Sequence, residues 1–340
     1  LLIKPVEGSL HNKNLLISIP HANLGQLPIG TLLTAPIKQP GKGANTFIAY
    51  QNAPWLIRKI AISQLPSVNA LAALRSAPSK SAQNQSFIAF ADPYFSKDQA
   101  QQKPTLAASL NTRGIPLRLR NAPKTSKVSS AELALLPPLP DTSLEVKEIA
   151  AVLGAKDGDI YLHEQANVSQ VLKTDFKNKN IIMFSTHGLV PGELDGLTQP
   201  ALALSTPEVT GEKDTDGLLT MDKILDLKLN ADWVVLSACN TASGDGNSEA
   251  VSGLGRAFFY AGARALLVSN WPVDTVASRE LMTDLFKRQA GDPNLAKAES
   301  LRRAMLELAD KGGYKDPKTK SISYAYGHPL FWAPFVVVGD

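Results

Sequence analysis

The chain alternates short, continuous apolar runs with amphipathic helical segments, and this alternation restricts its fold more than any other feature. The apolar runs predict strands at residues 15–19, 46–50, 87–90, 160–163, 180–186, 232–238, 265–269 and 335–338. One-sided apolar patterns predict helices at residues 67–75, 142–153, 168–176, 250–260, 278–289 and 295–310. Continuous apolar strands are typical of sheets covered on both faces. The pattern predicts an α/β fold with a mostly parallel sheet.

The length predicts either two lobes or one large doubly wound domain, because 340 residues exceed the size at which a single core usually stops growing. A basic stretch without any acid separates two parts of the chain; it contains Arg113, Arg118, Arg120, Lys124 and Lys127. We interpret this stretch as a solvated connector. Residues 1–130 are then an N-terminal lobe that ends in the connector, and residues 131–340 are a C-terminal lobe.

Composition excludes several classes of protein. Hydrophobic residues make up 44% of the chain and charged residues 19%, as in ordinary folded proteins. A net charge of +4 does not indicate nucleic-acid binding, and no apolar window of 18 residues indicates a membrane span. The single cysteine cannot form an internal disulfide, so we expect a cytoplasmic protein. The chain begins without Met or a signal-peptide pattern, which suggests a piece of a longer protein and leaves a secreted or periplasmic location open.

Two candidate catalytic side chains each follow an apolar run. His187 ends the run at 180–186, and Cys239 ends the run at 232–238. The carboxyl ends of parallel strands share one edge of the sheet, where open α/β folds place their sites. A nearby imidazole favours the thiolate, which is the reactive form of cysteine. The two positions therefore predict a base and a nucleophile. The alternative is that Cys239 is only a buried core residue.

Gly188 is a candidate oxyanion donor. No side chain shields its backbone N–H, which could point at a developing oxyanion together with the N–H of Cys239. Each such donor contributes about 3 kcal/mol to transition-state stabilisation.

Other residues offer weaker candidates for chemistry. His328 competes with His187 as the base, although its apolar neighbours favour a hydrogen-bonded core imidazole. His11, His21 and His163 lie in settings typical of surface or structural residues. No spacing indicates a metal site, and no glycine-rich loop indicates a nucleotide, so we expect no cofactor. Thr142 and Glu145 have the spacing of a capping box at the start of the helix at 142–153.

Four motifs together resemble the CHAT domain family, caspase-like peptidases often fused to tetratricopeptide repeats. They lie at residues 187–188, 236–242, 262–273 and 328–335, with weaker matches at 27–33 and 91–94. The resemblance extends from about residue 15 to the end of the chain. It implies a caspase-like α/β/α sandwich whose catalytic lobe, residues 131–340, follows a non-catalytic pseudo-protease lobe. It also implies that His187 and Cys239 are the catalytic pair, with Gly188 beside the oxyanion.

The resemblance also points to partners and substrates. It implies a protein substrate and regulation by an attached tetratricopeptide-repeat or sensor domain, which this chain does not contain. Relatives often bind the residue before the scissile bond with an acid, and Asp274 and Asp245 are the candidates here for a basic side chain. Trp271 is a candidate wall of a subsite. The alternatives are that Asp274 caps the following helix and that Trp271 is simply packed.

The leading hypothesis is a cysteine endopeptidase that attacks a peptide bond through the thiolate, forms an acyl-enzyme and hydrolyses it. A second hypothesis is a catalytically silent CHAT-like scaffold that only binds. A third is an acyl transferase that uses the same thiol. All three keep the same fold and differ in what happens at Cys239.

Overall fold

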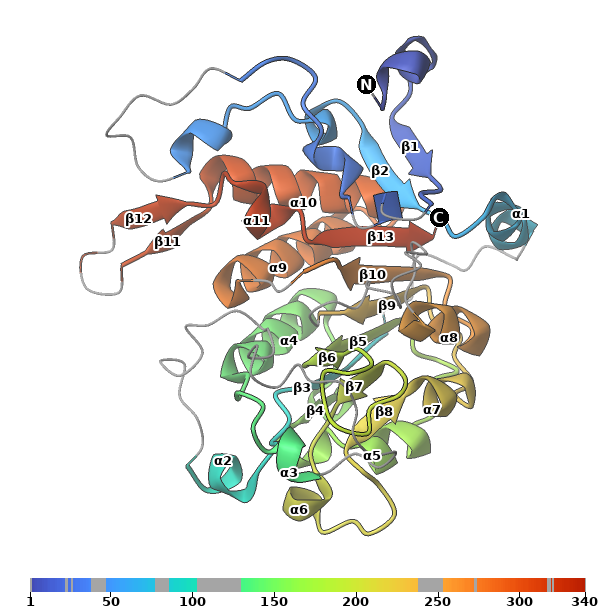
Figure 1. The fold of residues 1–340 in the computed structure, drawn as a ribbon, viewed down its shortest axis with the longest axis vertical. Helices are drawn as coiled ribbons and strands as arrows, with labels where there is room; N and C mark the ends of the chain where they lie inside the picture. The colour runs from blue at the N-terminus through green and yellow to red at the C-terminus, as the bar shows by residue number, and fades with distance from the viewer. Residues whose placement is uncertain are drawn as a thin grey trace.

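An eight-stranded sheet runs through the centre of the molecule (Figure 1). The computed structural model describes residues 2–21, 24–25, 27–37, 47–76, 86–102, 130–237, 253–271, 274–316, 319 and 321–339. In sheet order the strands are β1 (Leu15–Ser18), β2 (Ala61–Gln64), β13 (Phe335–Gly339), β10 (Ala265–Ser269), β9 (Trp233–Leu236), β5 (Ile181–Ser185), β3 (Phe87–Ala91) and β4 (Ile160–Leu162). Neighbouring strands are parallel except β10 and β13, which are antiparallel.

Helices cover both faces of this sheet. Alternate side chains of β5 enter separate apolar clusters: Ile181 and Met183 join one, and Ile182 and Phe184 join the other. The first cluster includes α4 (Pro140–Leu153), α9 (Thr275–Gly291) and α10 (Lys297–Lys311), and the second includes α5 (Val168–Lys173), α7 (Met221–Leu225) and α8 (Gly253–Ala261). The predicted α/β/α sandwich with a mostly parallel sheet is therefore confirmed.

Smaller elements surround the sandwich. Two small sheets are formed by β6 (Gly188–Leu189), β7 (Ala201–Ala203) and β8 (Leu218–Thr220), and by β11 (Gly313–Lys315) and β12 (Ile322–Ala325). The short helices are α1 (Val68–Ser76), α2 (Lys97–Gln102), α3 (Ser130–Leu133), α6 (Pro207–Thr210) and α11 (Pro329–Trp332). None of the helices within the described ranges is long and apolar enough to cross a membrane.

The predicted pseudo-protease lobe at residues 1–130 is not confirmed. Strands β1, β2 and β3 come from these residues, yet they belong to the same sheet as the later strands, and β3 lies between β5 and β4. The predicted connector falls largely at residues 103–129, which lie outside the described residues. The described parts of both proposed lobes therefore share one sheet.

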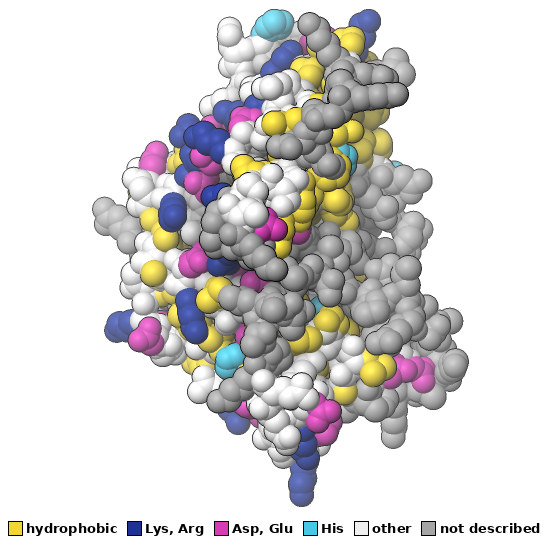
Figure 2. Space-filling view, turned by 90° about the vertical axis from the view of Figure 1, so that its left-hand side faces the viewer, with side chains coloured by type: hydrophobic (Ala, Val, Ile, Leu, Met, Phe, Trp, Pro, Cys, Tyr) yellow, Lys and Arg dark blue, Asp and Glu magenta, His cyan; other side chains and the backbone are white. Residues whose placement is uncertain are grey.

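The predicted strand at 46–50 is wrong. Residues Ile48–Tyr50 form a 3-10 helix, and Phe47 before it has a left-handed backbone with φ of 70°. The ring of Phe47 packs on Phe331 at 5.7 Å and on His328 at 5.2 Å. Figure 2 shows apolar side chains gathered on the upper part of the face that it presents. At residues 47–50, contacts with a distant part of the chain outweigh the strand propensity of the local sequence.

Candidate active site

Strands β5 and β9 lie side by side and bring two polar chain ends to the same edge of the sheet. Ile181 pairs with Trp233 and Phe184 with Leu236, so paired residues are 52 positions apart. The N–H of Ser237 donates to the carbonyl of Phe184 at 3.0 Å, which carries the pairing to the end of the strands. The same interval of 52 positions separates His187 from Cys239 in the sequence.

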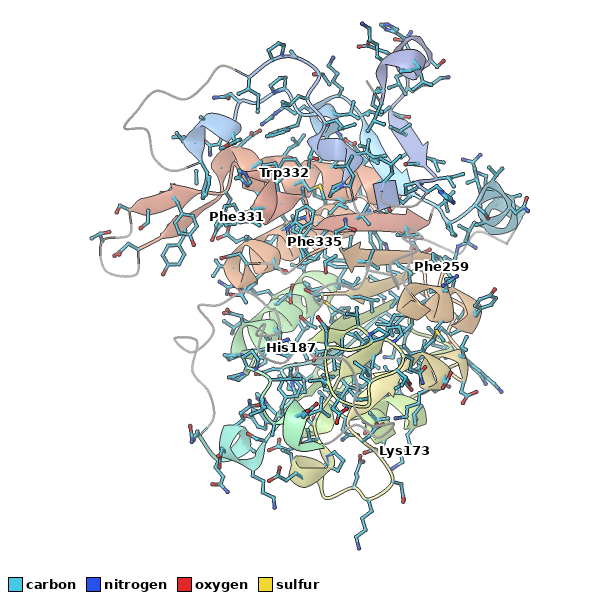
Figure 3. All side chains as sticks on the ribbon, in the orientation of Figure 1. Lys173, His187, Phe259, Phe331, Trp332 and Phe335 are labelled. Atoms are coloured by element: carbon cyan, nitrogen blue, oxygen red, sulfur yellow. The ribbon has the colours of Figure 1, made fainter. Side chains whose placement is uncertain are left out.

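His187 is fully buried just beyond the end of β5, near the middle of the molecule in Figure 3. Its Nε2 lies 2.8 Å from the carbonyl oxygen of Pro137, and its ring packs on Phe95 with 5.4 Å between ring centroids. A carbonyl oxygen only accepts, so Nε2 carries a proton and Nδ1 of the neutral ring holds the basic lone pair. The ring is thus held with a defined tautomer, as a general base requires.

A small apolar cluster encloses this part of the sheet edge. It combines Phe95 with residues of the β6–β7–β8 sheet, of the loop between β6 and β7, and of the segment that begins with α3. Its members are Phe95, Leu133, Leu136, Leu189, Leu194, Leu197, Ala201, Ala203 and Leu218. Through Phe95, which packs on the imidazole, this cluster helps to keep the fully buried His187 away from water. A drier surrounding strengthens electrostatic interactions at the imidazole.

Gly188 begins β6 and pairs with Leu202 of β7. The N–H of Ala203 donates to the carbonyl of His187 at 2.9 Å, which makes His187 and Ala203 a hydrogen-bonded pair of this antiparallel ladder. Hydrogen-bonded and non-bonded pairs alternate, so the N–H of Gly188 points away from β7. This orientation leaves the Gly188 N–H available for a role outside the ladder.

Two candidate residues fall outside the described part of the chain. Cys239 and Asp245 belong to residues 238–252, which lie outside the described residues. Ser237, two positions before Cys239, is the last described residue of that strand end and is fully buried. The nucleophile therefore remains a prediction from the sequence.

Trp271 and Asp274 lie between the end of β10 and the start of α9. The Nε1 of Trp271 donates to the carbonyl of Leu330 at 3.2 Å, and its ring packs against the main apolar cluster. Asp274 is the N-cap of α9, and its carboxylate accepts the N–H of Ala277 at 2.9 Å. The structural alternatives, a packed tryptophan and a helix cap, are thus both observed. A role of Trp271 and Asp274 in substrate binding therefore stays a prediction.

His328 lies apart from His187. It is the N-cap of α11, and its Nδ1 accepts the N–H of Leu330 at 3.1 Å. Figure 3 separates His187 clearly from Phe331 and Trp332 of α11. Burial lowers the pKa of His328. These contacts agree with the predicted hydrogen-bonded role for His328 and place it away from the end of β5.

A second polar pair lies at the same sheet edge. Asp92 follows β3, is only 3% exposed, and has a left-handed backbone with φ of 50°. Its carboxylate lies 3.5 Å from Nδ1 of His163, whose ring stacks on Tyr94. Burial raises the pKa of Asp92 to about 6, although His163 opposes the shift.

This shift predicts a pH dependence of stability. The native protein holds the proton on Asp92 more tightly than the unfolded chain, whose aspartate pKa is about 3.9. The contribution of Asp92 is therefore fully present below about pH 4 and declines as the pH rises to about 6 and beyond. We expect the free energy of unfolding of the wild type to fall relative to Asp92→Asn by on the order of 2 kcal/mol between pH 4 and 7. Urea unfolding at each pH unit measures this difference.

The control is Asp98→Asn, which makes the same chemical change at an exposed position. Parallel stability curves for wild type and Asp92→Asn over this range would contradict the prediction.

The predicted capping box at Thr142 and Glu145 is wrong. Helix α4 begins at Pro140 with Leu139 as its N-cap, and the hydroxyl of Thr142 donates to the carbonyl of Leu139. Glu145 faces the sheet and is fully buried, with Ser185 and Ser237 hydrogen bonded to its carboxyl group. Its place beside Val146, on the apolar side of the helix, was the signal for this burial.

The carbonyl of Pro137 was also missed, because a backbone atom leaves no trace in side-chain patterns. Among the described residues, no group of three or more His, Cys, Asp or Glu side chains has the arrangement of a metal site.

The chain is similar to known proteins in sequence and in fold. A family model for the CHAT domain matches residues 1–340. Tetratricopeptide repeat protein 28 is 34% identical to the chain in Mus musculus and 32% in Homo sapiens, each over 123 residues. The match covers 36% of this chain and 4% of either relative, so the chain spans a small fraction of their length.

Two kinds of solved structure are also similar. The Arg-specific cysteine proteinase gingipain R matches with a TM-score of 0.49 and 9% identity, over 99% of this chain and 66% of that chain. The separase–securin complex of Saccharomyces cerevisiae matches with a TM-score of 0.45 and 11% identity, over 86% of this chain and 14% of that chain.

Proposed function

Because the chain belongs to the CHAT domain family, we propose that it is a cysteine endopeptidase with His187 as base and Cys239 as nucleophile. The observation that carries the proposal is the register of β5 and β9, whose paired residues are as far apart in sequence as His187 and Cys239. Neighbouring strands lie about 4.8 Å apart. Cys239 is two residues after Ser237, so their Cα atoms are at most about 7 Å apart. The thiol can therefore come within reach of the imidazole.

The residues around His187 support a defined sequence of steps. Nδ1 of His187 takes the proton of the thiol, and the resulting thiolate attacks the carbonyl carbon of the scissile peptide bond. The N–H groups of Gly188 and Cys239 stabilise the oxyanion. The imidazolium then gives its proton to the leaving amine, and water hydrolyses the thioester. Nε2 carries a proton both in the neutral ring and in the imidazolium. The carbonyl of Pro137 therefore accepts a hydrogen bond from Nε2 in both forms.

Active-site labelling tests this proposal. We expect a peptide chloromethylketone to modify Cys239 selectively in the wild type, and the same preparation to cleave a peptide library. Cys239→Ala removes both the modification and the cleavage. A wild-type protein that neither reacts at Cys239 nor cleaves any peptide would favour the silent scaffold. Product masses that show transfer to an amine or a thiol instead of water would favour an acyl transferase.

For specificity, we propose that Asp274 binds a basic residue before the scissile bond, that Asp245 is the alternative acid, and that Trp271 forms a wall of a subsite. Loss of a charge-assisted contact in a pocket costs about 1.5–3 kcal/mol. Asp274→Ala should therefore lower the preference for Arg and Lys by roughly 10- to 100-fold. Asp274→Asn is the informative control, because an asparagine still caps α9. A cleavage profile dominated by apolar residues would overturn the acid assignment.

We also propose that tetratricopeptide repeats or a sensor domain regulate this activity and that the substrate is a protein. The curated relatives carry tetratricopeptide repeats in their name, which supports the first of these proposals. A cytoplasmic location remains part of the proposal.

A further inference from the structure

Glu145 joins the ends of both strands of the candidate site from beneath the sheet edge. Its carboxyl group is fully buried on α4. The hydroxyl of Ser185 donates to Oε2 at 2.5 Å, and that of Ser237 donates to Oε1 at 3.0 Å and reaches Oε2 at 3.3 Å. A third serine, Ser278 of α9, lies 3.5 Å from Oε1. One carboxyl group thus accepts hydrogen bonds from β5 and from the end of β9.

The position of the two strand serines connects Glu145 to the proposed chemistry. Ser185 precedes His187 by two residues, and Ser237 precedes Cys239 by two residues. A shift of either strand end along its axis would change the distances to both carboxyl oxygens. The hydrogen bonds therefore resist sliding of one strand end relative to the other.

Apolar packing already holds α4 in place. Val146 and Ile149 of α4 share an apolar cluster with Leu281 and Leu285 of α9. Burying a carboxyl group and three hydroxyls in such a layer costs free energy that hydrophobic side chains would not cost. Attachment of α4 to the sheet therefore does not explain why a carboxyl group is buried at position 145.

We propose that Glu145 is a positioning residue, which fixes the carboxyl ends of β5 and β9 relative to each other and so sets the approach of His187 to Cys239. This inference rests on the proposed peptidase function. Glu145 itself touches no reacting atom in this scheme.

The chain offers a matched control in Glu148. It lies on the same helix and also bonds α9, through Arg279 at 3.1 Å and Thr283 at 3.0 Å. It is exposed, and among the described residues no hydrogen bond joins it to the end of β5 or β9. Glu145→Gln and Glu148→Gln thus make the same chemical change on the same helix. A carboxamide offers only one oxygen, so in Glu145→Gln one of the two strand serines has to reorient.

The two variants are compared by the kcat and KM of peptide cleavage and by the pH profile of Cys239 alkylation with iodoacetamide. A misplacement of about 1 Å costs on the order of 100-fold in rate. We expect Glu145→Gln to lower kcat by about 10- to 100-fold with little change in KM. Its alkylation profile should also shift to higher pH, because the imidazole stabilises the thiolate less well. Glu148→Gln should match the wild type in all three measurements.

Ser185→Ala and Ser237→Ala provide a second route if Glu145→Gln does not fold. Each removes one hydrogen bond to Glu145, and each should shift the alkylation profile in the same direction. If Glu145→Gln folds, adding either serine change to it should have less effect than adding that change to the wild type, because the bond is already disturbed. The inference is overturned if Glu145→Gln, or both serine variants, give the kcat and alkylation profile of Glu148→Gln.

Failure of the proposed function has a different signature. If His187→Gln leaves the alkylation profile of Cys239 unchanged, the base assignment is wrong, whatever Glu145 does. If His187→Gln shifts the profile and Glu145→Gln does not, the assignment of His187 as base is supported and the positioning role of Glu145 is wrong.

Discussion

The kcat of peptide cleavage falls by on the order of 10²- to 10⁴-fold when His187 is replaced with glutamine, the range that a general acid–base residue contributes. Glutamine can still donate to the carbonyl of Pro137, as Nε2 does at 2.8 Å in the wild type. It cannot take a proton from the thiol. The loss should therefore come from the chemical step, with substrate binding largely kept. Steady-state kinetics on a peptide found in the cleavage profile separate the two.

His163 is the control for this substitution. It follows β4 at the same edge of the sheet, but β3 and β5 lie between β4 and β9. We expect His163→Gln to cleave at nearly the wild-type rate. Equal kcat values for the two glutamine variants would remove His187 from the mechanism.

Replacing Trp332 with alanine should lower the free energy of unfolding by about 3–5 kcal/mol. Trp332 is 1% exposed, and its ring meets that of Trp55 edge-on at 5.8 Å. Its Nε1 donates to the carbonyl of Gly327 at 3.0 Å. The residue thus connects the first part of the chain to the last. Urea unfolding followed by fluorescence and by far-ultraviolet circular dichroism measures the loss.

The control is Tyr260→Ala, which removes an aromatic ring that is 83% exposed and should change stability by less than about 0.5 kcal/mol. Because the sheet passes through both halves, we expect the two signals to report a single transition in wild type and variant. Two separate transitions, of which only the later one responds to Trp332→Ala, would indicate independent lobes.

Local patterns were sufficient to predict the strands that the second half contributes to the eight-stranded sheet, and its longer helices, but not the strands of the two small sheets. Strand β10 and helix α9 follow unambiguous apolar runs and stripes, so burial and periodicity point to the same structure. The strand-end position of His187 follows from the same logic. Local sequence decides such elements because each one buries its own apolar side.

The order of the strands could not be predicted in this way. β3 is inserted between β5 and β4, and such pairing depends on the whole set of strands, which no single segment encodes. The Thr-x-x-Glu spacing at Glu145 suits both a helix start and one side of a helix, and only the surrounding serines decide between them. At Phe47, aromatic contacts with residues nearly 300 positions away outweigh local propensity.

The position of β13 has a consequence for the synthesis of the protein. This strand comes last in the chain, yet it lies between β2 and β10, and among the described strands β1 and β2 reach the rest of the sheet through it. A ribosome that adds about 5–20 residues per second needs about 15–50 s to make the roughly 270 residues between β2 and β13. During this interval the nascent β1 and β2 have no sheet to join, and their pairing has to wait for residues 335–339 to emerge.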